Sequence, residues 1–475
     1  MGEYRFRLPD FWKLNKSRAA CIHVVGMEGI PWPCRVKVAE ELLVISRNQN
    51  DSGKVHIPYP FETRGEMAIC TGTLPESSQV YDLMTELARG TLNRLRNQLS
   101  TWGEGGLEIA DSLLEQVAQA TRHLSASVVS VEPLEKDEAA MKSIEIAIDC
   151  IFELSRIFGE SISAYRVSQK QLAPFWLAGN LASHPVSQTA EMGSCFDLFE
   201  VPWVSPAVQA GGDPKNLIVG PLLDASAGAQ TWPGDSTDDF ETRKKNLLSE
   251  CRERLSHLPS HTSLVHAVSG LNGIGHRQLS FPQQQQLTTE LFQVIQDASL
   301  EIPIVASFDF PWAERLAGSV GGMHPLQVAD SLLRQALPIS FIGLDVNLDY
   351  WPAGSVARDP LQWIDLIDVW GQLGLPLIFC LRIPQGVEPG VAKESAGKAG
   401  NHMRAGMSDE QRLELVEVVL SMLIARPNVH GCLFRQWSDD DDLRYPGAGL
   451  VTAGDEPKAI LQEIDRYHRD VLNRG

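Results

Sequence analysis

The sequence lacks the features that mark membrane and secreted proteins. No apolar run approaches the roughly 20 residues needed to cross a bilayer. The start, MGEYRFRLPDFWKLNK, has no basic stretch followed by an apolar one, as a secretory signal would have. We therefore expect a chain without a membrane span or signal, located in the cytoplasm.

Clustered basic charge is also missing. The 475 residues include 41 Lys and Arg against 60 Asp and Glu, which gives a formal net charge of −19. Nucleic acids and anionic membrane surfaces are bound through clustered Lys and Arg, so we expect neither as a partner. The eight cysteines are scattered and include no CxxC pair, which favours reduced, buried thiols over a disulfide framework.

Familiar cofactor motifs are absent as well. No GxGxxG follows an apolar strand, and GSVGGMH (318–324) has the wrong spacing for a dinucleotide site. There is no HExxH; His266, His276 and Asp309 are a less favoured metal set, because a single His within a strand is usually a hydrogen-bonded core residue. We predict no cofactor and no metal, and the sequence predicts no particular oligomeric state.

Eight apolar segments alternate with helical stretches in the last two thirds of the chain. They are apolar on both faces, as strands between a barrel core and a surrounding layer of helices must be. This alternation predicts a (β/α)8 TIM barrel over residues 174–475, an α/β fold whose site lies in the loops after the strand C-termini. The predicted strands are 175–180, 195–203, 216–224, 263–273, 302–310, 340–348, 375–384 and 429–437.

Two further regions precede the barrel. Residues 1–75 are rich in strand-like segments, at 20–26, 33–47, 54–61 and 65–74. Residues 76–173 change to a helical period and predict a connector of three helices, at 80–102, 106–124 and 137–167. For the β-rich region we favour a platform that packs on the barrel; a carbohydrate-binding accessory is the alternative.

Large aromatic residues follow the predicted strands. Five of the eleven tryptophans do so, with Tyr350 beside them: Trp203, Trp232, Trp312, Trp351 and Trp437. Such residues can stack on the apolar faces of sugar rings and form a ligand groove. The alternative is that each one fills the mouth of the barrel.

Acidic residues converge on the same predicted face. Asp224 and Asp309 end two strands, Asp345 and Asp349 lie in GLDVNLDYW (343–351), and Asp439 follows Trp437. By alternation Asp345 could point into the barrel and Asp349 into a groove. Asp345 could be a buried acid that donates a proton, or it could be hydrogen-bonded to backbone or to Arg382.

The end of the chain carries a resemblance to a known family. HGCLFRQWSDDDD…GAGLVTAGDEPKAILQEI is similar to the last strand, Trp-containing loop, turn and final helix of the (β/α)8 glycoside hydrolases, closest to the family 10 xylanases. The matching positions are Trp437, Gly449, Leu450, Gly454 and Lys458. The resemblance covers the chain from about residue 174 onward and implies a barrel that acts on a carbohydrate.

Both glutamates that the resemblance leads us to expect are missing. The retaining members of that clan use two glutamates roughly 5 Å apart. Gly273 stands after Asn272 where the acid/base would be, and Leu381 or Arg382 stands in the place of the nucleophile.

Three interpretations remain open: a hydrolase with relocated acids, a non-catalytic sugar-binding descendant, and a scaffold. For catalysis we predict Asp345 and Asp439 as the acid pair. For the carbohydrate we predict contacts from Asn272, Asp309, Asp349 and Tyr350 and from the tryptophans at positions 203, 312, 351 and 437.

Overall fold

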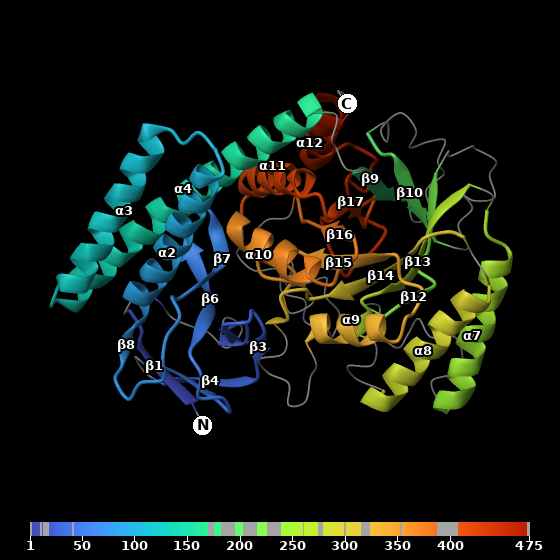
Figure 1. Cartoon of the computed structure of the whole chain (residues 1–475), viewed down its shortest axis with the longest axis horizontal. Coiled ribbons are helices and arrows are strands. Elements are labelled where there is room, and N and C mark those ends of the chain that lie inside the picture. The colour runs from blue at the N-terminus through green and yellow to red at the C-terminus, as the bar shows by residue number, and fades with distance from the viewer. Residues whose placement is uncertain are drawn as a thin grey trace.

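The computed structural model describes residues 2–9, 12, 19–39, 42–169, 175–181, 195–202, 216–225, 239–259, 261–273, 279–298, 301–314, 324–351, 354–386 and 407–472. Within these residues the chain forms two small sheets, a set of long helices and a barrel (Figure 1).

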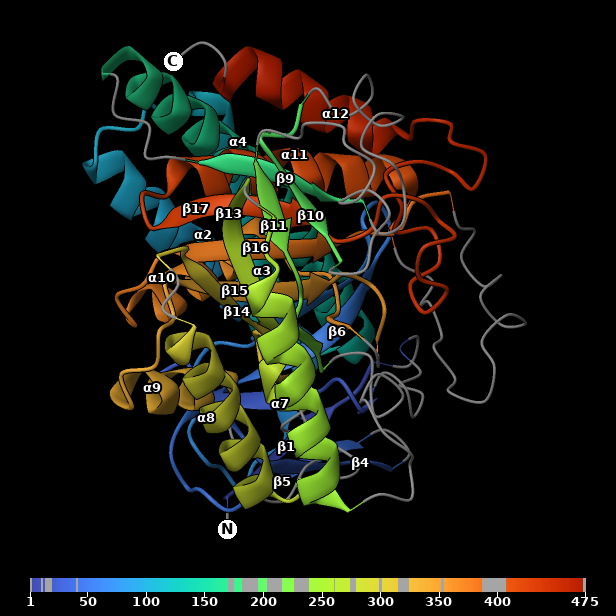
Figure 2. The same ribbon diagram turned by 90° about the vertical axis from the view of Figure 1, so that its right-hand side faces the viewer.

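A closed parallel barrel occupies the C-terminal part of the chain, and it confirms the predicted (β/α)8 fold. Its strands are β9 (Trp176–Asn180), β10 (Leu198–Val201), β11 (Leu217–Val219), β12 (Leu223–Asp224), β13 (Thr262–Ser269), β14 (Ile304–Asp309), β15 (Phe341–Asn347), β16 (Leu377–Arg382) and β17 (Val429–Phe434). Strand β17 pairs with β9, and β11 pairs with β13, so the ring is complete (Figure 2).

The third strand position of the barrel is divided into two short strands. Both β11 and β12 pair with β13, and Gly220 and Pro221 lie between them. Proline has no N–H to donate to a ladder, and Gly220 has a φ of 148°, which few other residues adopt. The single strand predicted at 216–224 is therefore interrupted.

Six helices and a short terminal turn surround the barrel in the described residues. They are α7 (Phe240–Ser256), α8 (Phe281–Asp297), α9 (Pro325–Arg334), α10 (Pro360–Gly371), α11 (Asp409–Ala425) and α12 (Ala459–Tyr467), followed by a turn at His468–Leu472. The sequence signals at two helix starts are confirmed: Asp359 accepts from Gln362 N, and Ser408 forms a capping box with Gln411.

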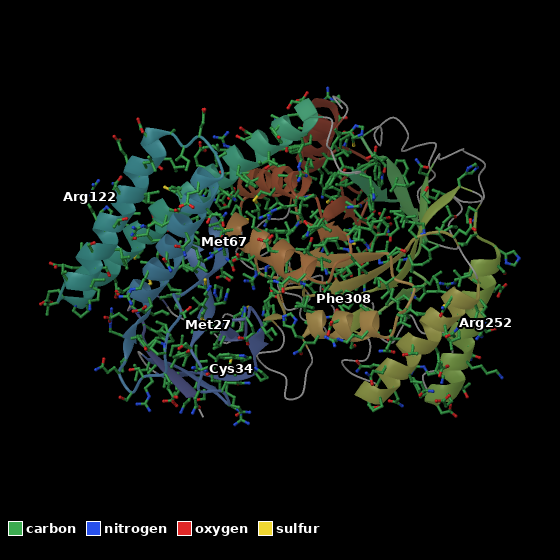
Figure 3. All side chains as sticks on the ribbon, viewed as in Figure 1. Met27, Cys34, Met67, Arg122, Arg252 and Phe308 are labelled. Atoms are coloured by element: carbon green, nitrogen blue, oxygen red, sulfur yellow. The ribbon has the colours of Figure 1, made fainter. Side chains whose placement is uncertain are left out.

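Alternate strand residues face the barrel interior and the helices. The interior has an apolar layer consisting of Ala178, Leu198, Ile218, Leu264, Val305, Ile378, Cys380 and Leu433. On the outer side, Phe308 of β14 packs against Trp370 of α10, with ring centroids 5.4 Å apart (Figure 3). Strands buried on both faces in this way explain the continuous apolar segments of the sequence.

The N-terminal strands form two four-stranded sheets. One has the order β4-β5-β1-β8, and the other has the order β3-β2-β6-β7. Their bounds are β1 (Gly2–Arg7), β2 (His23–Gly26), β3 (Pro31–Trp32), β4 (Cys34–Ala39), β5 (Leu42–Arg47), β6 (Gly53–Phe61), β7 (Gly65–Cys70) and β8 (Tyr81–Asp82). Strand β8 pairs with β1, so this sheet extends past residue 75, the predicted end of the β-rich region.

Three long helices connect these sheets to the barrel: α2 (Leu83–Glu104), α3 (Asp111–Val129) and α4 (Pro133–Gln169). Helix α4 packs against α11 of the barrel, and Arg166 donates to the carbonyl oxygen of Ile424 at 3.1 Å. Helix α3 lies on the side of α4 away from the barrel strands, whereas α2 lies beside β7 of the second N-terminal sheet (Figure 1). Among the described residues, no helix is long and apolar enough to cross a membrane.

The N-terminal sheets contact the barrel after β15. Ala68 N donates to Ala357 O at 2.8 Å, and Cys21 and Ala68 cluster with Phe310 and Trp351. This contact agrees with a platform role for the β-rich region. The domain boundaries at 75 and 173 stay a prediction. All eight cysteines are buried and free of disulfides.

Candidate functional site

A polar layer lies above the apolar interior of the barrel. Glu200 of β10 is fully buried, and its Oε1 lies 2.6 Å from Nδ1 of His266 on β13. Its other oxygen accepts a hydrogen bond from Asn180 of β9 and lies 3.5 Å from Arg435 Nε. His266 Nε2 in turn lies 3.0 Å from Ser307 Oγ on β14.

Asp345 belongs to the same layer. Its Oδ2 accepts from Ser307 Oγ at 2.6 Å, Gly270 N at 2.9 Å and Ser269 Oγ at 3.3 Å. Its Oδ1 lies 3.5 Å from Arg435 Nη1. Asp345 thus points into the barrel as alternation predicted, and the arginine beside it is Arg435 rather than Arg382.

The charged side chains in this layer shift one another's pKa. Burial alone would raise the pKa of Glu200, but the Arg435 charge and the hydrogen bond from His266 outweigh it and lower that pKa to about 2. Burial would lower the pKa of Arg435, yet the neighbouring Glu200 and Asp345 raise it. Glu200 and Arg435 are therefore both charged at neutral pH.

A second polar layer lies at the strand ends, where β14, β15 and β16 reach the C-terminal face. Asp309 Oδ1 accepts from Asn347 Nδ2 at 3.4 Å, and Arg382 Nη1 donates to Asn347 Oδ1 at 3.0 Å. Asn272 makes two 2.7 Å hydrogen bonds to the backbone of Asp309, so it links the end of β13 to the end of β14.

The loop after β17 supplies the remaining groups of this rim. Asp442 and Arg444 form a paired ion contact of 2.6 and 2.8 Å, and Arg444 Nη2 lies 3.9 Å from Asp224 at the end of β12. Arg382 lies 4.4 Å over the ring of Tyr445. We define the rim as Asp224, Asn272, Asp309, Asn347, Arg382, Asp442, Arg444 and Tyr445.

Asp439 and Asp349, two other predicted acids, have other partners. Asp439 Oδ1 accepts from Lys458 Nζ at 2.6 Å and from Gly449 N at 3.0 Å. Asp349 lies 3.8 Å from Arg412 of α11 and has a φ of 61°. Asp345 and Asp439, the predicted acid pair, thus take part in two separate sets of contacts, one around Arg435 and one around Lys458.

The predicted aromatic residues that the structure describes are packed to different degrees. Trp437 is buried and makes an edge contact with Phe196, while Trp351 is buried against Phe310. Trp312 is half-buried; its Nε1 donates to Gln362 O at 3.3 Å. Trp203 and Trp232 lie outside the described residues.

Tyr350 is buried next to the rim. Its hydroxyl donates to Pro446 O at 2.8 Å, and its ring meets Tyr445 edge-on at 5.1 Å. Whether the predicted aromatic residues contact a sugar stays a prediction.

The positions that match the family's glutamates differ in direction. Leu381 packs in the hydrophobic core between the barrel strands and the helices. Arg382, the last residue of β16, points to the barrel interior and contacts Asn347 of the rim. Gly273 ends the turn Leu271–Gly273 that follows β13.

Sequence reasoning missed Glu200, His266 and Arg435 as a linked set. A glutamate inside the apolar segment CFDLFEVPW was the available signal, because a buried charge in a strand requires a partner. The partners themselves come from strands far along the chain, so only the barrel brings them together. Among the described residues, no three His, Cys, Asp or Glu gather to hold a metal ion, and His276 lies outside them.

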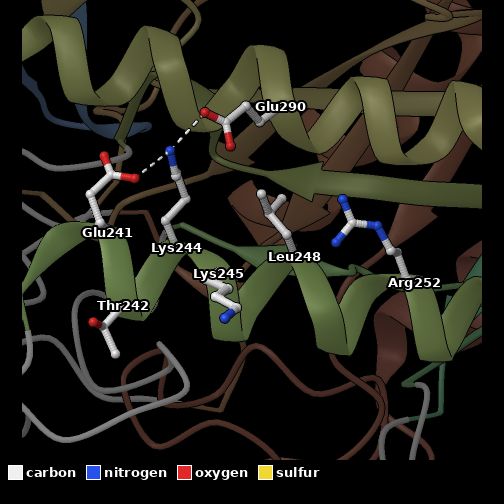
Figure 4. A pocket seen from close by; sticks show the side chains of 7 residues that line it. All are labelled: Glu241, Thr242, Lys244, Lys245, Leu248, Arg252 and Glu290. Atoms are coloured by element: carbon white, nitrogen blue, oxygen red, sulfur yellow. Dashed lines mark hydrogen bonds and ion pairs between the residues drawn. The ribbon is translucent and has the colours of Figure 1, made fainter.

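A surface groove of about 440 Å³ lies elsewhere, between α7 and α8. Lys244 is paired there with Glu241 at 2.9 Å and with Glu290 at 2.7 Å, while Lys245 and Arg252 line the same groove (Figure 4). It lies on the outer helices and does not include a rim residue.

No protein-family model matches the chain, and no curated protein matches its sequence. Several solved structures are similar in fold at low identity. Xylanase 10B from Thermotoga maritima is 12% identical with a TM-score of 0.43, over 67% of this chain and 99% of that one. Xylanase A from P. fluorescens subsp. cellulosa, in complex with xylopentaose, is 13% identical with a TM-score of 0.43, over 63% and 99%.

A Bifidobacterium dentium beta-glucuronidase is 10% identical with a TM-score of 0.42, over 63% of this chain and 46% of that one. At these values the similarity concerns the fold alone. The class that the strand pairing defines is the (β/α)8 barrel.

Proposed function

We propose that this chain binds a carbohydrate at the C-terminal face of its barrel, as a glycoside hydrolase-like protein. The observation that carries the proposal is the rim, where side chains with hydrogen-bonding groups from the ends of β12, β14, β15 and β16 meet the loop after β17. Sugar sites use such fixed polar groups to orient a ligand, and the rim presents Arg444 and Asp224 with side chains 38% and 23% exposed.

The contacts of the two predicted acids favour binding over hydrolysis. Glycoside hydrolysis needs one carboxyl group that gives a proton and a second that acts as nucleophile or base. Asp345 accepts three hydrogen bonds on one oxygen, and Asp439 accepts from Lys458. These oxygens act as hydrogen-bond acceptors, which supports binding over hydrolysis.

Hydrolysis is the second candidate, and the carboxylates at strand ends favour it. Glu200, Asp224, Asp309 and Asp345 all lie at or near the C-terminal ends of barrel strands. Inverting hydrolysis needs two acids about 6.5–9.5 Å apart, so relocated acids could serve.

One assay separates the two candidates. The native protein is mixed with xylan, arabinan, mannan, glucan and pectin, and both retention on the polysaccharide and release of reducing ends are measured. We expect retention on at least one polysaccharide without release. Release that disappears in Asp345→Asn or Asp439→Asn would establish a hydrolase. Neither retention nor release with any of the five would contradict the proposed function.

A further inference from the structure

A second groove, of about 400 Å³, lies where the helices α4, α11 and α12 meet on the outside of the barrel. Helix α11 contacts both α4 and α12, and the three helices lie together towards the top of Figure 1. We call this space the three-helix groove. It includes no rim residue, so it is separate from the proposed carbohydrate site.

A close helix contact and small side chains explain why this groove is open. At Gly159 the backbone of α4 touches α11, since a Cβ built there would collide with the Ser421 side chain. One helical turn further along α4, Ser163 and Ala164 line the groove. Neither side chain is large enough to fill the space beside α11 and α12, so room for a ligand is left.

The lining combines apolar surface with one hydroxyl that lacks a partner. Tyr467 and Val471 add apolar surface to that of Ala164. The Tyr467 hydroxyl donates to Glu417 O at 3.1 Å, whereas Ser163 is 6% exposed and its Oγ has no hydrogen-bond partner among the described residues. Buried hydroxyl groups are nearly always hydrogen-bonded, so this oxygen favours a ligand that brings a polar group into the groove.

Negative charge dominates the opening of the groove. Among the described residues that line it, Glu160, Glu417 and Asp470 are carboxylates and Arg466 is the one guanidinium. Arg466 is itself paired with Glu417 at 2.7 Å and with Glu463 at 2.5 Å. The last turn of α4 also lines the groove, and the C-terminal end of a helix carries a partial negative charge. The opening therefore attracts a cation.

We propose that the three-helix groove binds a small organic cation, in which a protonated amine is attached to an apolar body of one or two rings. The apolar body lies against Tyr467 and Val471, the amine faces the carboxylates, and a polar group on the ring reaches Ser163. The groove, at about 400 Å³, falls in the range of about 300–1,000 Å³ that is usual for small-molecule sites. This inference does not depend on the proposed function.

An anionic ligand is disfavoured in the same groove. The Arg466 guanidinium, which would have to bind it, is already shared by two carboxylates. The carboxylates at the opening would repel an anion, and the formal net charge of −19 adds to that repulsion. The charge of the ligand therefore distinguishes this site from a groove that binds any apolar molecule.

Calorimetric titration of the whole chain with three related probes tests the inference. Tryptamine, tryptophol and indole-3-acetate share an indole ring with its N–H group, and they carry an amine, a hydroxyl and a carboxylate respectively. We expect tryptamine to bind about tenfold more tightly than tryptophol, and indole-3-acetate to bind more weakly still. Equal affinities for the three probes, or no binding of tryptamine, would overturn the inference.

Two tryptophan variants of α4 show where the probe binds. Ala164→Trp places a large ring in the groove, and because Ala164 is exposed the fold should stay intact. Ser161→Trp places the same ring at an exposed position of α4 that does not line the groove. We expect Ala164→Trp to abolish tryptamine binding and Ser161→Trp to retain it. Unchanged binding in both variants would place the probe elsewhere and overturn the inference.

Two glutamates of α4 test the role of charge without changing the shape of the groove. Glu160 and Glu153 both pair with Arg156, at 3.1 and 2.7 Å, but of the two only Glu160 lines the groove. Glu160→Gln should weaken tryptamine binding about threefold, and Glu153→Gln should leave it unchanged. Equal effects of the two variants would contradict the charge argument, and this pair decides if Ala164→Trp does not fold.

Discussion

Single residues far apart in the sequence form buried ion pairs that join the N-terminal helices to the barrel. Arg94 of α2 donates to both oxygens of Asp359 at 2.9 and 3.0 Å, and the Asp359 side chain is fully buried. Burial would raise the pKa of Asp359, but Arg94 and the hydrogen bonds from Gln362 lower it. Asp359 is also the N-cap of α10, so this pair ties α2 to the start of a barrel helix.

Replacing Arg94 should therefore be costly. Arg94→Ala leaves a charged Asp359 buried without its main partner, and we expect a loss of about 3–5 kcal/mol in the free energy of unfolding. Urea denaturation measures the change. Arg89→Ala in the same helix is the matched control, because the Arg89 side chain is 49% exposed beside Glu86 and should cost less than about 1 kcal/mol. Equal losses in the two variants would contradict the account.

At this scale the sequence could predict which residues lie near strand ends but not their partners. Asp309 ends β14 as predicted, and it pairs in register with Asp345, which lies inside β15. Arg435 could not be assigned to Asp345 from the sequence. Arg382 is the arginine closer to Asp345 along the chain, so it was the partner that the sequence suggested. The register and inward direction of four strands decide such contacts.

Among the elements, helix α2 packs very closely on the second N-terminal sheet. Gly90 makes this possible, since a Cβ built there would lie 2.1 Å from the Cys70 carbonyl oxygen and 2.4 Å from the Thr71 carbonyl carbon. Both atoms are backbone and cannot turn away. The contact between α2 and β7 is thus set by a glycine in the middle of a helix.

Gly90→Ala should destabilise the protein although alanine is the better helix former. Helix propensity alone would favour Ala by about 1 kcal/mol, but overpacking against backbone costs about 1–3 kcal/mol and should prevail. Gly103→Ala in the same helix is the control: its Cβ would meet only the end of the Ile109 side chain at 3.2 Å. Thermal unfolding should show a lower midpoint for Gly90→Ala only; a higher midpoint would contradict this packing argument.

Most helices and strands were predictable because the apolar pattern that defines each one lies within its own segment of the sequence. The helices at 80–102, 106–124 and 137–167 correspond to α2, α3 and α4, since an apolar stripe with a 3.6-residue period depends on nothing distant. Strand β1 was missed although Tyr4 and Phe6 alternate with polar residues, because the segment GEYRFR is short and rich in charge. The third barrel strand was predicted as one continuous strand. Its division into β11 and β12, which each pair with β13 on either side of Pro221, is not visible in the sequence.

On the scale of the whole molecule, the junction between the N-terminal sheets and the barrel contains buried histidines. His23 and His56 stack with ring centroids 4.8 Å apart, and Arg358 of the barrel lies 3.5 Å from His56. Burial, with Arg358 adding to it, lowers the pKa of His23 to about 3, and burial also lowers the pKa of His56 well below its ordinary value.

This junction should weaken in acid. Below the unfolded pKa of 6.5, the unfolded chain binds protons at these histidines while the folded chain does not, so stability falls as the pH falls from 6.5 towards 3. At about 1.4 kcal/mol per pKa unit, His23 alone removes about 2 kcal/mol at about pH 5. Urea midpoints between about pH 7 and 5 measure the loss, and His23→Gln should make it shallower. An unchanged slope in that variant would contradict the assignment.

The central claim is that the rim of the barrel binds a carbohydrate, and affinity electrophoresis tests it most directly. Native protein, Arg444→Gln and Arg252→Gln are run in gels containing xylan, arabinan, mannan, glucan or pectin, each against a blank gel. Arg444 lies in the rim with its side chain 38% exposed, whereas Arg252 lies on α7 in the outer groove (Figure 3). We expect at least one polysaccharide to retard the native protein and Arg252→Gln equally and Arg444→Gln less. No retardation in any gel, or equal retardation of all three proteins, would contradict the account.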